Sequence, residues 1–242
     1  MSVYREPRIT PSGGYVLHVE LCEGISRECN ELVHRLYYAV LEMVREGEAH
    51  GIREAVPAYS SLTLFYDPRL TTARAVADVV KEALSRASKA EGGGLVKPRE
   101  FRIPVVYGGD WGPDLKDVAS MTGLSEDEVV KIHTSRAYVC YMLGFTPGFI
   151  YLGEVDERIA VPRLEKPRVR VPAGSVGIAG RQTGVYGVTS PGGWRLIGRT
   201  PLKMFDPGRT PPTPIRPGDR VRFYEISEGE FRELLNKFVG EV

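Results

Sequence analysis

The segment 144–208 constrains the fold more than any other part of this chain. Twelve glycines and seven prolines fall within it, between short β-branched or apolar runs. Glycine loses much backbone entropy on folding, so this density indicates positive φ angles, tight corners or close backbone approach. Prolines fix turns and strand ends. A flexible linker would be poor in apolar residues, whereas this segment keeps Phe145, Phe149, Ile150, Val176, Ile178, Val185, Trp194 and Ile197. The segment therefore predicts tightly cornered β-structure.

Length and composition indicate a soluble globular protein of one large or two small domains. The chain has 242 residues, of which 42% are hydrophobic and 26% charged, an ordinary globular composition. Its net charge of +1 argues against nucleic-acid binding, which usually shows a clear basic excess. We find neither a signal-peptide pattern nor a long apolar run, so we expect no membrane segment.

The cysteines bear on the compartment and on metal binding. Cys22, Cys29 and Cys140 are an odd number, and no two have CxxC spacing. This usage predicts a reducing compartment and no zinc site. We therefore expect a cytoplasmic protein without a bound metal.

Periodicity in the first hundred residues predicts an α+β domain. Apolar residues at helical spacing follow Ser26 and stop at Gly47; a second such stretch follows the candidate N-caps Thr71 and Thr72 and stops at the glycine run 92–94. The predicted strands are 15–21, 52–56, 60–66 and 101–107. The resulting order, βαββαβ, is that of a ferredoxin-like domain.

The second half predicts a barrel with a few short helices. Pro113 and Gly123 fit the start and stop of one helix. Ser125 and Glu128 have capping-box spacing for another, which reaches His133. A terminal helix is predicted at 229–239, and strands at 137–143, 149–152, 158–161, 168–171, 176–179, 185–189, 194–197 and 220–226.

Many short strands with Gly/Pro corners favour a closed or nearly closed barrel. We place the boundary between Gly92 and Pro104, which gives an N-terminal domain at 1–100 and a barrel domain at 101–242.

The run GFTPGFIYLGEVDERIAVPRLEKPRVRVPAGSVGIAGRQTGVYGVTSPGGWRLIGRTP resembles the signature of the 5-oxoprolinase B-subunit family, also called KipI or allophanate hydrolase subunit 1. The upstream VVYGGDWGPDL at 105–115 fits the same pattern. The resemblance implies a ferredoxin-like N-terminal domain and specifies the barrel as cyclophilin-like.

The resemblance also implies an activity. A member of this family is one component of an ATP-dependent enzyme that opens 5-oxo-L-proline to L-glutamate. It works with a homologue of the C subunit (KipA-like) and with a metal-dependent A subunit, and we expect it to be inactive alone. Which of these subunits binds ATP stays open.

Two alternatives come from the same resemblance. KipI-type members inhibit a sensor kinase, which would make the chain a regulatory binding protein. The same domain pair occurs as a carboxyltransferase module in urea carboxylase, although this chain has no biotin-acceptor Met-Lys dipeptide.

The glycine-flanked tripeptide Arg181, Gln182, Thr183 is the sharpest candidate site. Gln182 is the one glutamine of the chain and lies between Gly180 and Gly184. An arginine fork suits carboxylate or phosphate, and amide and hydroxyl groups orient small polar ligands. We expect catalytic roles for Arg181 and Gln182 and substrate contacts from Thr183 and the two glycines. The alternative is a solvated turn.

Other candidates surround this tripeptide. His133 either complements a helix dipole or transfers protons at the barrel mouth. Phe145, Phe149 and Tyr151 either line a ligand groove or belong to the core. Gly148 is expected to contact the substrate, and Arg199 beside a glycine corner is expected to face it. The chain has no HExxH, GxSxG, P-loop or GxGxxG signature, which argues against a self-contained hydrolase.

Overall fold

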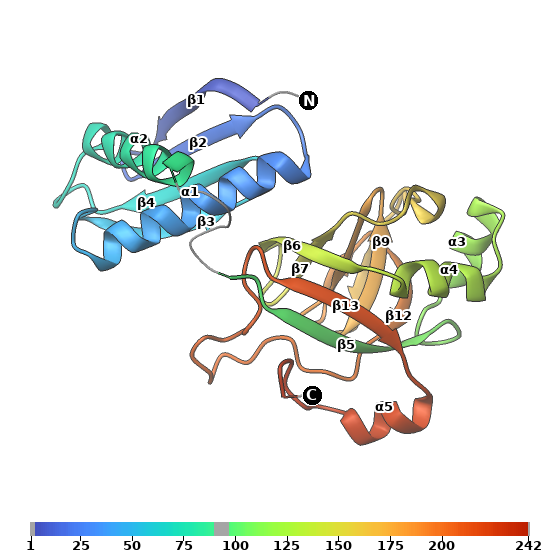
Figure 1. Ribbon diagram of the computed structural model, residues 1–242. Coiled ribbons are helices and arrows are strands. Elements are labelled where there is room, and N and C mark those ends of the chain that lie inside the picture. The colour runs from blue at the N-terminus through green and yellow to red at the C-terminus, as the bar shows by residue number, and fades with distance from the viewer. Residues whose placement is uncertain (1–2, 90–96, 242) are drawn as a thin grey trace. The chain divides into compact units, whose positions relative to one another are not determined.

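The computed structural model describes residues 3–89 and 97–241 (Figure 1). The chain divides into two compact units, Met1–Pro98 and Arg99–Val242. The predicted glycine stop at 92–94 lies outside the described residues. Among the helices of the described ranges, none is long and apolar enough to cross a membrane.

The N-terminal unit is an antiparallel four-stranded sheet with two helices on one face (Figure 1). Alternate residues of its central strands, among them Leu17, Val19 and Leu62, are buried against apolar residues of both helices, as the period of two along a strand requires. The sheet order is β1-β2-β4-β3. The elements are β1 (Val3–Ser12), β2 (Val16–Cys22), α1 (Arg27–Arg45), β3 (Ile52–Pro57), β4 (Ser61–Tyr66) and α2 (Ala73–Lys89).

This sheet differs in one strand from the predicted βαββαβ order. The strand predicted at 101–107 belongs to the barrel, where it pairs with two barrel strands. The fourth position of the N-terminal sheet is instead filled by β1, which was not predicted. Pro7 and Pro11 lie on this edge strand, where a missing N–H donor is tolerated. The α+β class itself is confirmed.

A disulfide joins Cys22, at the end of β2, to Cys29, in the first turn of α1. Cys140 is a free, buried cysteine. The cysteine count predicted a reducing compartment, in which disulfides are rare, so this pairing contradicts that argument. The cytoplasmic location stays a prediction.

The C-terminal unit is a closed barrel in the order β10-β7-β6-β13-β5-β12-β9. Its neighbours are antiparallel except β5 and β13, which lie side by side in parallel although distant in sequence (Figure 1). The barrel strands are β5 (Glu100–Tyr107), β6 (Ala137–Leu143), β7 (Ile150–Gly153), β9 (Ser175–Ala179), β10 (Gln182–Val185), β12 (Arg195–Arg199) and β13 (Arg220–Glu225). A separate pair is formed by β8 (Arg168–Val171) and β11 (Ser190–Gly192).

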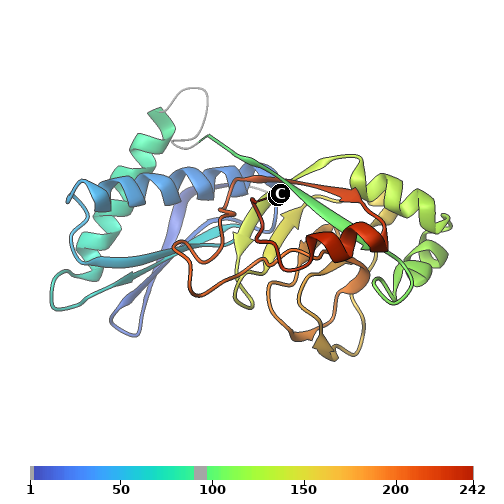
Figure 2. The same ribbon diagram turned by 90° about the horizontal axis from the view of Figure 1, so that it is seen from below.

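Three helices and a 3-10 turn lie outside the barrel wall. They are α3 (Leu115–Thr122), α4 (Glu126–Thr134), α5 (Glu228–Leu234) and η1 (Glu157–Ile159). The capping box of Ser125 and Glu128 is formed at the start of α4. α5 packs beside β5 through the buried Phe231 (Figure 2). The strand predicted at 158–161 was wrong: Asp156 caps η1 there, and Val161 makes only an isolated bridge.

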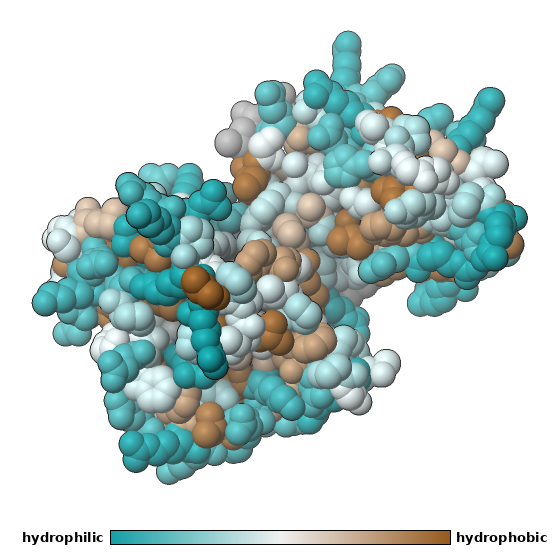
Figure 3. Space-filling model, turned by 180° about the vertical axis from the view of Figure 1, so that it is seen from behind, coloured by the Kyte–Doolittle hydropathy of each residue, from teal (hydrophilic) through white to brown (hydrophobic). Residues whose placement is uncertain are grey.

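Inward-facing residues of the strands fill the barrel with one apolar core. Ile150, Leu152, Val176 and Ile178 are fully buried in it, together with Phe223. The surface is mixed: on the face that Figure 3 shows, apolar side chains gather in small groups between polar ones, as is usual for soluble domains.

Candidate functional site

The barrel interior holds a chain of hydrogen bonds centred on His133, which is fully buried. Its Nε2 lies 2.9 Å from Thr183 Oγ1, and its Nδ1 lies 2.8 Å from the Tyr107 hydroxyl. Thr183 Oγ1 donates its single proton to the Gly177 carbonyl at 3.0 Å. His133 Nε2–H must therefore donate to Thr183, and Nδ1 accepts from Tyr107. This chain of hydrogen bonds connects α4 to three strands.

The imidazole is held in its neutral form. Burial lowers the pKa of His133 to about 3, because desolvation disfavours the imidazolium. The ring stacks on Phe223 at a centroid distance of 4.7 Å, and burial raises the pKa of Tyr107 well above its usual value. The structure thus gives His133 the geometry of a cross-link inside the barrel, and its catalytic role stays a prediction.

Arg181 and Thr183 point to opposite sides of the barrel wall. Arg181 lies in the β9–β10 turn, where its guanidinium contacts Glu154 Oε2 at 2.7 Å and Glu157 Oε1 at 3.0 Å. Its side chain is 54% exposed, whereas Thr183 is fully buried. Gln182 begins β10 between them, opposite residues of both neighbouring strands. The tripeptide therefore does not form one continuous polar wall.

The structure explains why both position 180 and position 184 are glycine. Gly180 has a φ of +58° at the start of the two-residue turn joining β9 to β10, where tight hairpins require positive φ. A Cβ on Gly184 would lie 2.5 Å from the Ile150 carbonyl oxygen and 3.1 Å from the Trp194 ring. Close packing of backbone and aromatic ring thus requires glycine at position 184.

Phe149 is the centre of a cluster of aromatic side chains. Its ring is buried and lies 4.6 Å from that of Tyr151, 4.9 Å from Tyr186 and 5.3 Å from Trp194, measured between centroids. Tyr151 and Trp194 are partly exposed. Phe149 thus occupies a core position, and the partly exposed rings of Tyr151 and Trp194 pack against it.

Phe145 lies above this cluster in a turn that we call the GFTPGF turn, residues 144–149. Its side chain is 61% exposed, and its φ is +64°. The Thr146 N–H donates to the Gly144 carbonyl at 2.8 Å, so Phe145 is the central residue of a γ-turn. Gly148 has a φ of +71°, and a Cβ there would lie 2.5 Å from Phe205 Cβ.

Arg199 lies apart from these groups. Its Nε donates to the Ala173 carbonyl at 2.9 Å, and its guanidinium lies 6.0 Å from the centroid of the Trp111 ring. Partial burial lowers the pKa of Arg199. The predicted residues therefore occupy several places: the barrel interior, the β9–β10 turn, the GFTPGF turn and the end of β12.

One ion pair with a buried carboxylate was not anticipated from the sequence. Asp114 accepts two bonds from Arg168 at 2.9 and 2.7 Å and one from the Leu196 N–H at 2.6 Å. It ties α3 to β8 and β12. No motif marks these residues, because the pair joins segments 54 positions apart.

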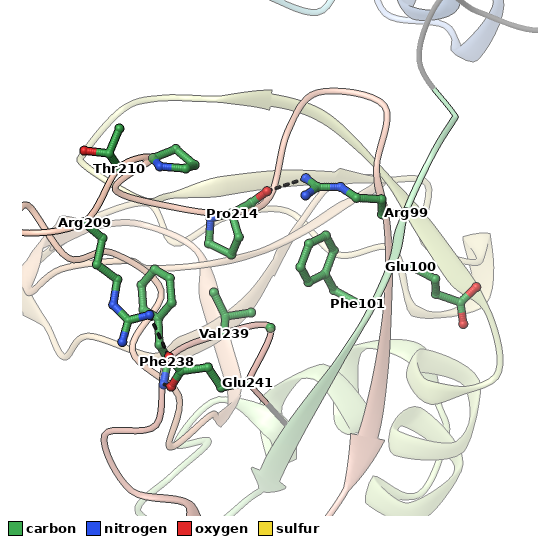
Figure 4. A pocket seen from close by; sticks show the side chains of 11 residues that line it. Arg99, Glu100, Phe101, Arg209, Thr210, Pro214, Phe238, Val239 and Glu241 are labelled. Atoms are coloured by element: carbon green, nitrogen blue, oxygen red, sulfur yellow. Dashed lines mark hydrogen bonds and ion pairs between the residues drawn. The ribbon is translucent and has the colours of Figure 1, made fainter.

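A pocket of about 620 Å³ opens on another side of the barrel unit (Figure 4). Arg99 and Arg209 flank it, but Asp219 and Glu241 respectively already neutralise them. No predicted site residue lines it; the lining is Arg99, Glu100, Phe101, Arg209, Thr210, Pro211, Pro214, Phe238, Val239, Gly240 and Glu241. Across the described ranges, no three His, Cys, Asp or Glu side chains are grouped to hold a metal.

Comparison with known proteins gives consistent matches. Residues 7–215 match the model of the family described as carboxyltransferase domain, subdomain C and D. The chain is 46% identical to the 5-oxoprolinase B subunit of Bacillus subtilis (strain 168), over 84% of this chain and 88% of that protein. It is 48% identical to the 5-oxoprolinase B subunit of Escherichia coli O157:H7, over 74% of this chain and 80% of that protein.

A solved structure extends the comparison. The protein TTHA0988 is 40% identical to this chain, with a TM-score of 0.73, over 88% of this chain. The match spans only 40% of the TTHA0988 chain. In that relative, the region equivalent to this protein is part of a much longer polypeptide.

Proposed function

Because the chain belongs to the carboxyltransferase-domain family (subdomains C and D), we propose that it is the B subunit of an ATP-dependent 5-oxoprolinase. The complex would convert 5-oxo-L-proline to L-glutamate, with a C-subunit homologue and the A subunit as partners. The observation that carries the proposal is the identity of 46% over 84% of the chain to a 5-oxoprolinase B subunit. We place the complex in the cytoplasm, where ATP is available.

The reaction explains why ATP is needed. The ring amide of 5-oxoproline is a poor electrophile, and transfer of a phosphoryl group to its oxygen activates the carbon for attack by water. A first water adds to this carbon and the C–N bond breaks, which leaves an acyl phosphate. A second water then hydrolyses the acyl phosphate to glutamate and phosphate. Charge develops on oxygen during both steps, and preorganised N–H donors stabilise such charge.

The site residues enter this proposal with different roles. Arg181 and Gln182, at the start of β10, would supply donors to the substrate. Arg181 would exchange its ion pairs with Glu154 and Glu157 for the substrate, and the buried Gln182 amide nitrogen would have to turn towards it. His133 and Thr183 would act as positioning residues, because their hydrogen bond of 2.9 Å holds the same strand from inside the barrel. Because His133 is neutral and enclosed, we assign it no role as a general base, and we expect the partner subunits to complete the site.

The proposal is tested by reconstitution. The purified A, B and C subunits are mixed with 5-oxoproline and ATP, and glutamate release is followed. We expect ATP-dependent release from the full mixture and none when this chain is omitted. Equal release without this chain, or release by this chain alone, would contradict the proposal.

A further inference from the structure

We propose that Phe145 is the anchor through which this chain binds its partner, with the exposed phenyl ring entering an apolar pocket of the C-subunit homologue. The inference rests on the proposed function, which supplies the partner. To the proposed function it adds the contact surface, which is the GFTPGF turn, and the residue that makes the main contact, which is Phe145.

The first observation is backbone strain at Phe145. A residue with a side chain rarely adopts a φ of +64°, and a phenylalanine there is an outlier. Glycine would adopt this angle without strain, and the turn already contains Gly144 and Gly148. Strained residues of this kind persist mainly where function requires them. The turn therefore retains a phenyl ring at a position that favours glycine.

The second observation is where the strain places the ring. Phe145 is the most exposed aromatic side chain among the residues that the structure describes, at 61%. One edge of it meets the buried Phe149 ring at 5.8 Å, while most of its surface faces solvent. The Phe145 ring is thus positioned by its contact with Phe149, while the rest of its surface is accessible to a partner.

The third observation is that the turn is preformed. The Gly144 N–H donates to the Phe149 carbonyl at 3.2 Å, and the Phe149 N–H donates to the Thr146 carbonyl at 3.1 Å. Phe205 packs against Gly148 from the other side. A ring fixed before binding loses little freedom on association, and rigid aromatic anchors of this kind often dominate interface energies.

A protein partner is the occupant that the observations favour. In TTHA0988 the equivalent region makes up only 40% of the chain, so there it is covalently joined to further protein. Under the proposed function, the C-subunit homologue would take that role for the present chain. A small polar substrate would gain little from a largely exposed phenyl ring, whereas an apolar pocket of a protein partner would bury it.

The test compares three variants of the full chain. Phe145→Ala removes the ring and keeps the strain, and Phe145→Gly removes both. Leu235→Ala is the matched control, because Leu235 is an exposed apolar residue of the same unit, at 52%. Affinity for the purified C-subunit homologue is measured by titration calorimetry, and Tm by calorimetry of each isolated chain.

We expect both Phe145 variants to bind at least about tenfold more weakly, as removal of an interface anchor does. We expect Leu235→Ala to bind like the wild type. The Tm should stay unchanged or rise, and be higher for Phe145→Gly than for Phe145→Ala, because glycine relieves the strain.

Three results would overturn the inference. Unchanged affinity for the C-subunit homologue in both Phe145 variants would exclude the contact. If turnover alone fell while this affinity stayed unchanged, the ring would touch substrate instead of the partner, which would also exclude the contact. A Tm loss that accompanies the affinity loss in both variants would make the ring structural. A wild-type chain that does not bind the C-subunit homologue would remove the partner. A complex that depends on Phe145 but releases no glutamate would contradict only the proposed function.

Discussion

Acidification from about pH 7.5 to about pH 5 is expected to destabilise the barrel unit through His133. The pKa of this group falls from 6.5 to about 3 on folding. Between these values the unfolded chain binds a proton that the folded chain excludes, so the free energy of unfolding rises with pH. The stabilisation is complete above the unfolded pKa and is lost as the pH falls towards 3.

The magnitude follows from linkage. At about pH 5 the unfolded imidazole is nearly all protonated and the folded one is neutral, which lowers the free energy of unfolding by about 2 kcal/mol relative to about pH 7.5. Guanidinium unfolding followed by tryptophan fluorescence measures this directly, because Trp111 and Trp194 both lie in the barrel unit.

The control is His133→Gln, which keeps a donor and an acceptor but does not titrate. The difference between wild type and variant isolates the His133 contribution from that of the carboxylates. We expect the wild type to lose about 2 kcal/mol more than the variant on acidification. Equal losses in both would refute the assignment of a neutral, enclosed imidazole.

Three further changes test other parts of the structure. Arg181→Ala should lower turnover of the reconstituted complex at least about tenfold with little change in Tm, since exposed turn residues contribute little stability; full turnover would remove Arg181 from the site. Cys22→Ser with Cys29→Ser should lower the free energy of unfolding of the N-terminal unit by roughly 2 to 3 kcal/mol, as expected for a short closed loop; chemical denaturation with unchanged stability would show that the disulfide is not formed in solution. Gly184→Ala should destabilise the barrel by roughly 1 to 3 kcal/mol, since its Cβ would lie 2.5 Å from the Ile150 oxygen; a thermal melt like that of the wild type would contradict this packing.

Much of the fold was predictable because its signals are local. The helical period after Ser26, the capping box of Ser125 and Glu128, and the glycine stop at Gly123 each act within a few residues. All three are found in the structure. The barrel class followed from the spacing of strands and corners.

The remaining differences come partly from long-range pairing and partly from local signals that the periodicity does not carry. Periodicity locates a strand at 101–107 but does not say which sheet receives it, and its partner β13 lies more than a hundred residues away. The edge strand β1 was missed because its prolines and exposed residues resemble a loop. The segment 158–161 is apolar enough for a strand, but the cap at Asp156 turns it into a 3-10 helix.

The candidate site was harder to anticipate than the fold. Arg181 and Thr183 are two positions apart in the sequence. Arg181 lies in the β9–β10 turn and its side chain points outward, whereas Thr183 lies in β10 and its side chain points into the barrel. The burial of His133 depends on Tyr107 and Thr183, which no local pattern connects to it. The strain at Phe145 is visible only in the backbone.

The most direct test of the proposed function is reconstitution with this chain omitted. We predict that glutamate appears from 5-oxoproline and ATP only when this chain is present with its partner subunits, and that its removal stops the reaction. Glutamate release at the same rate without this chain would contradict its assignment as the B subunit.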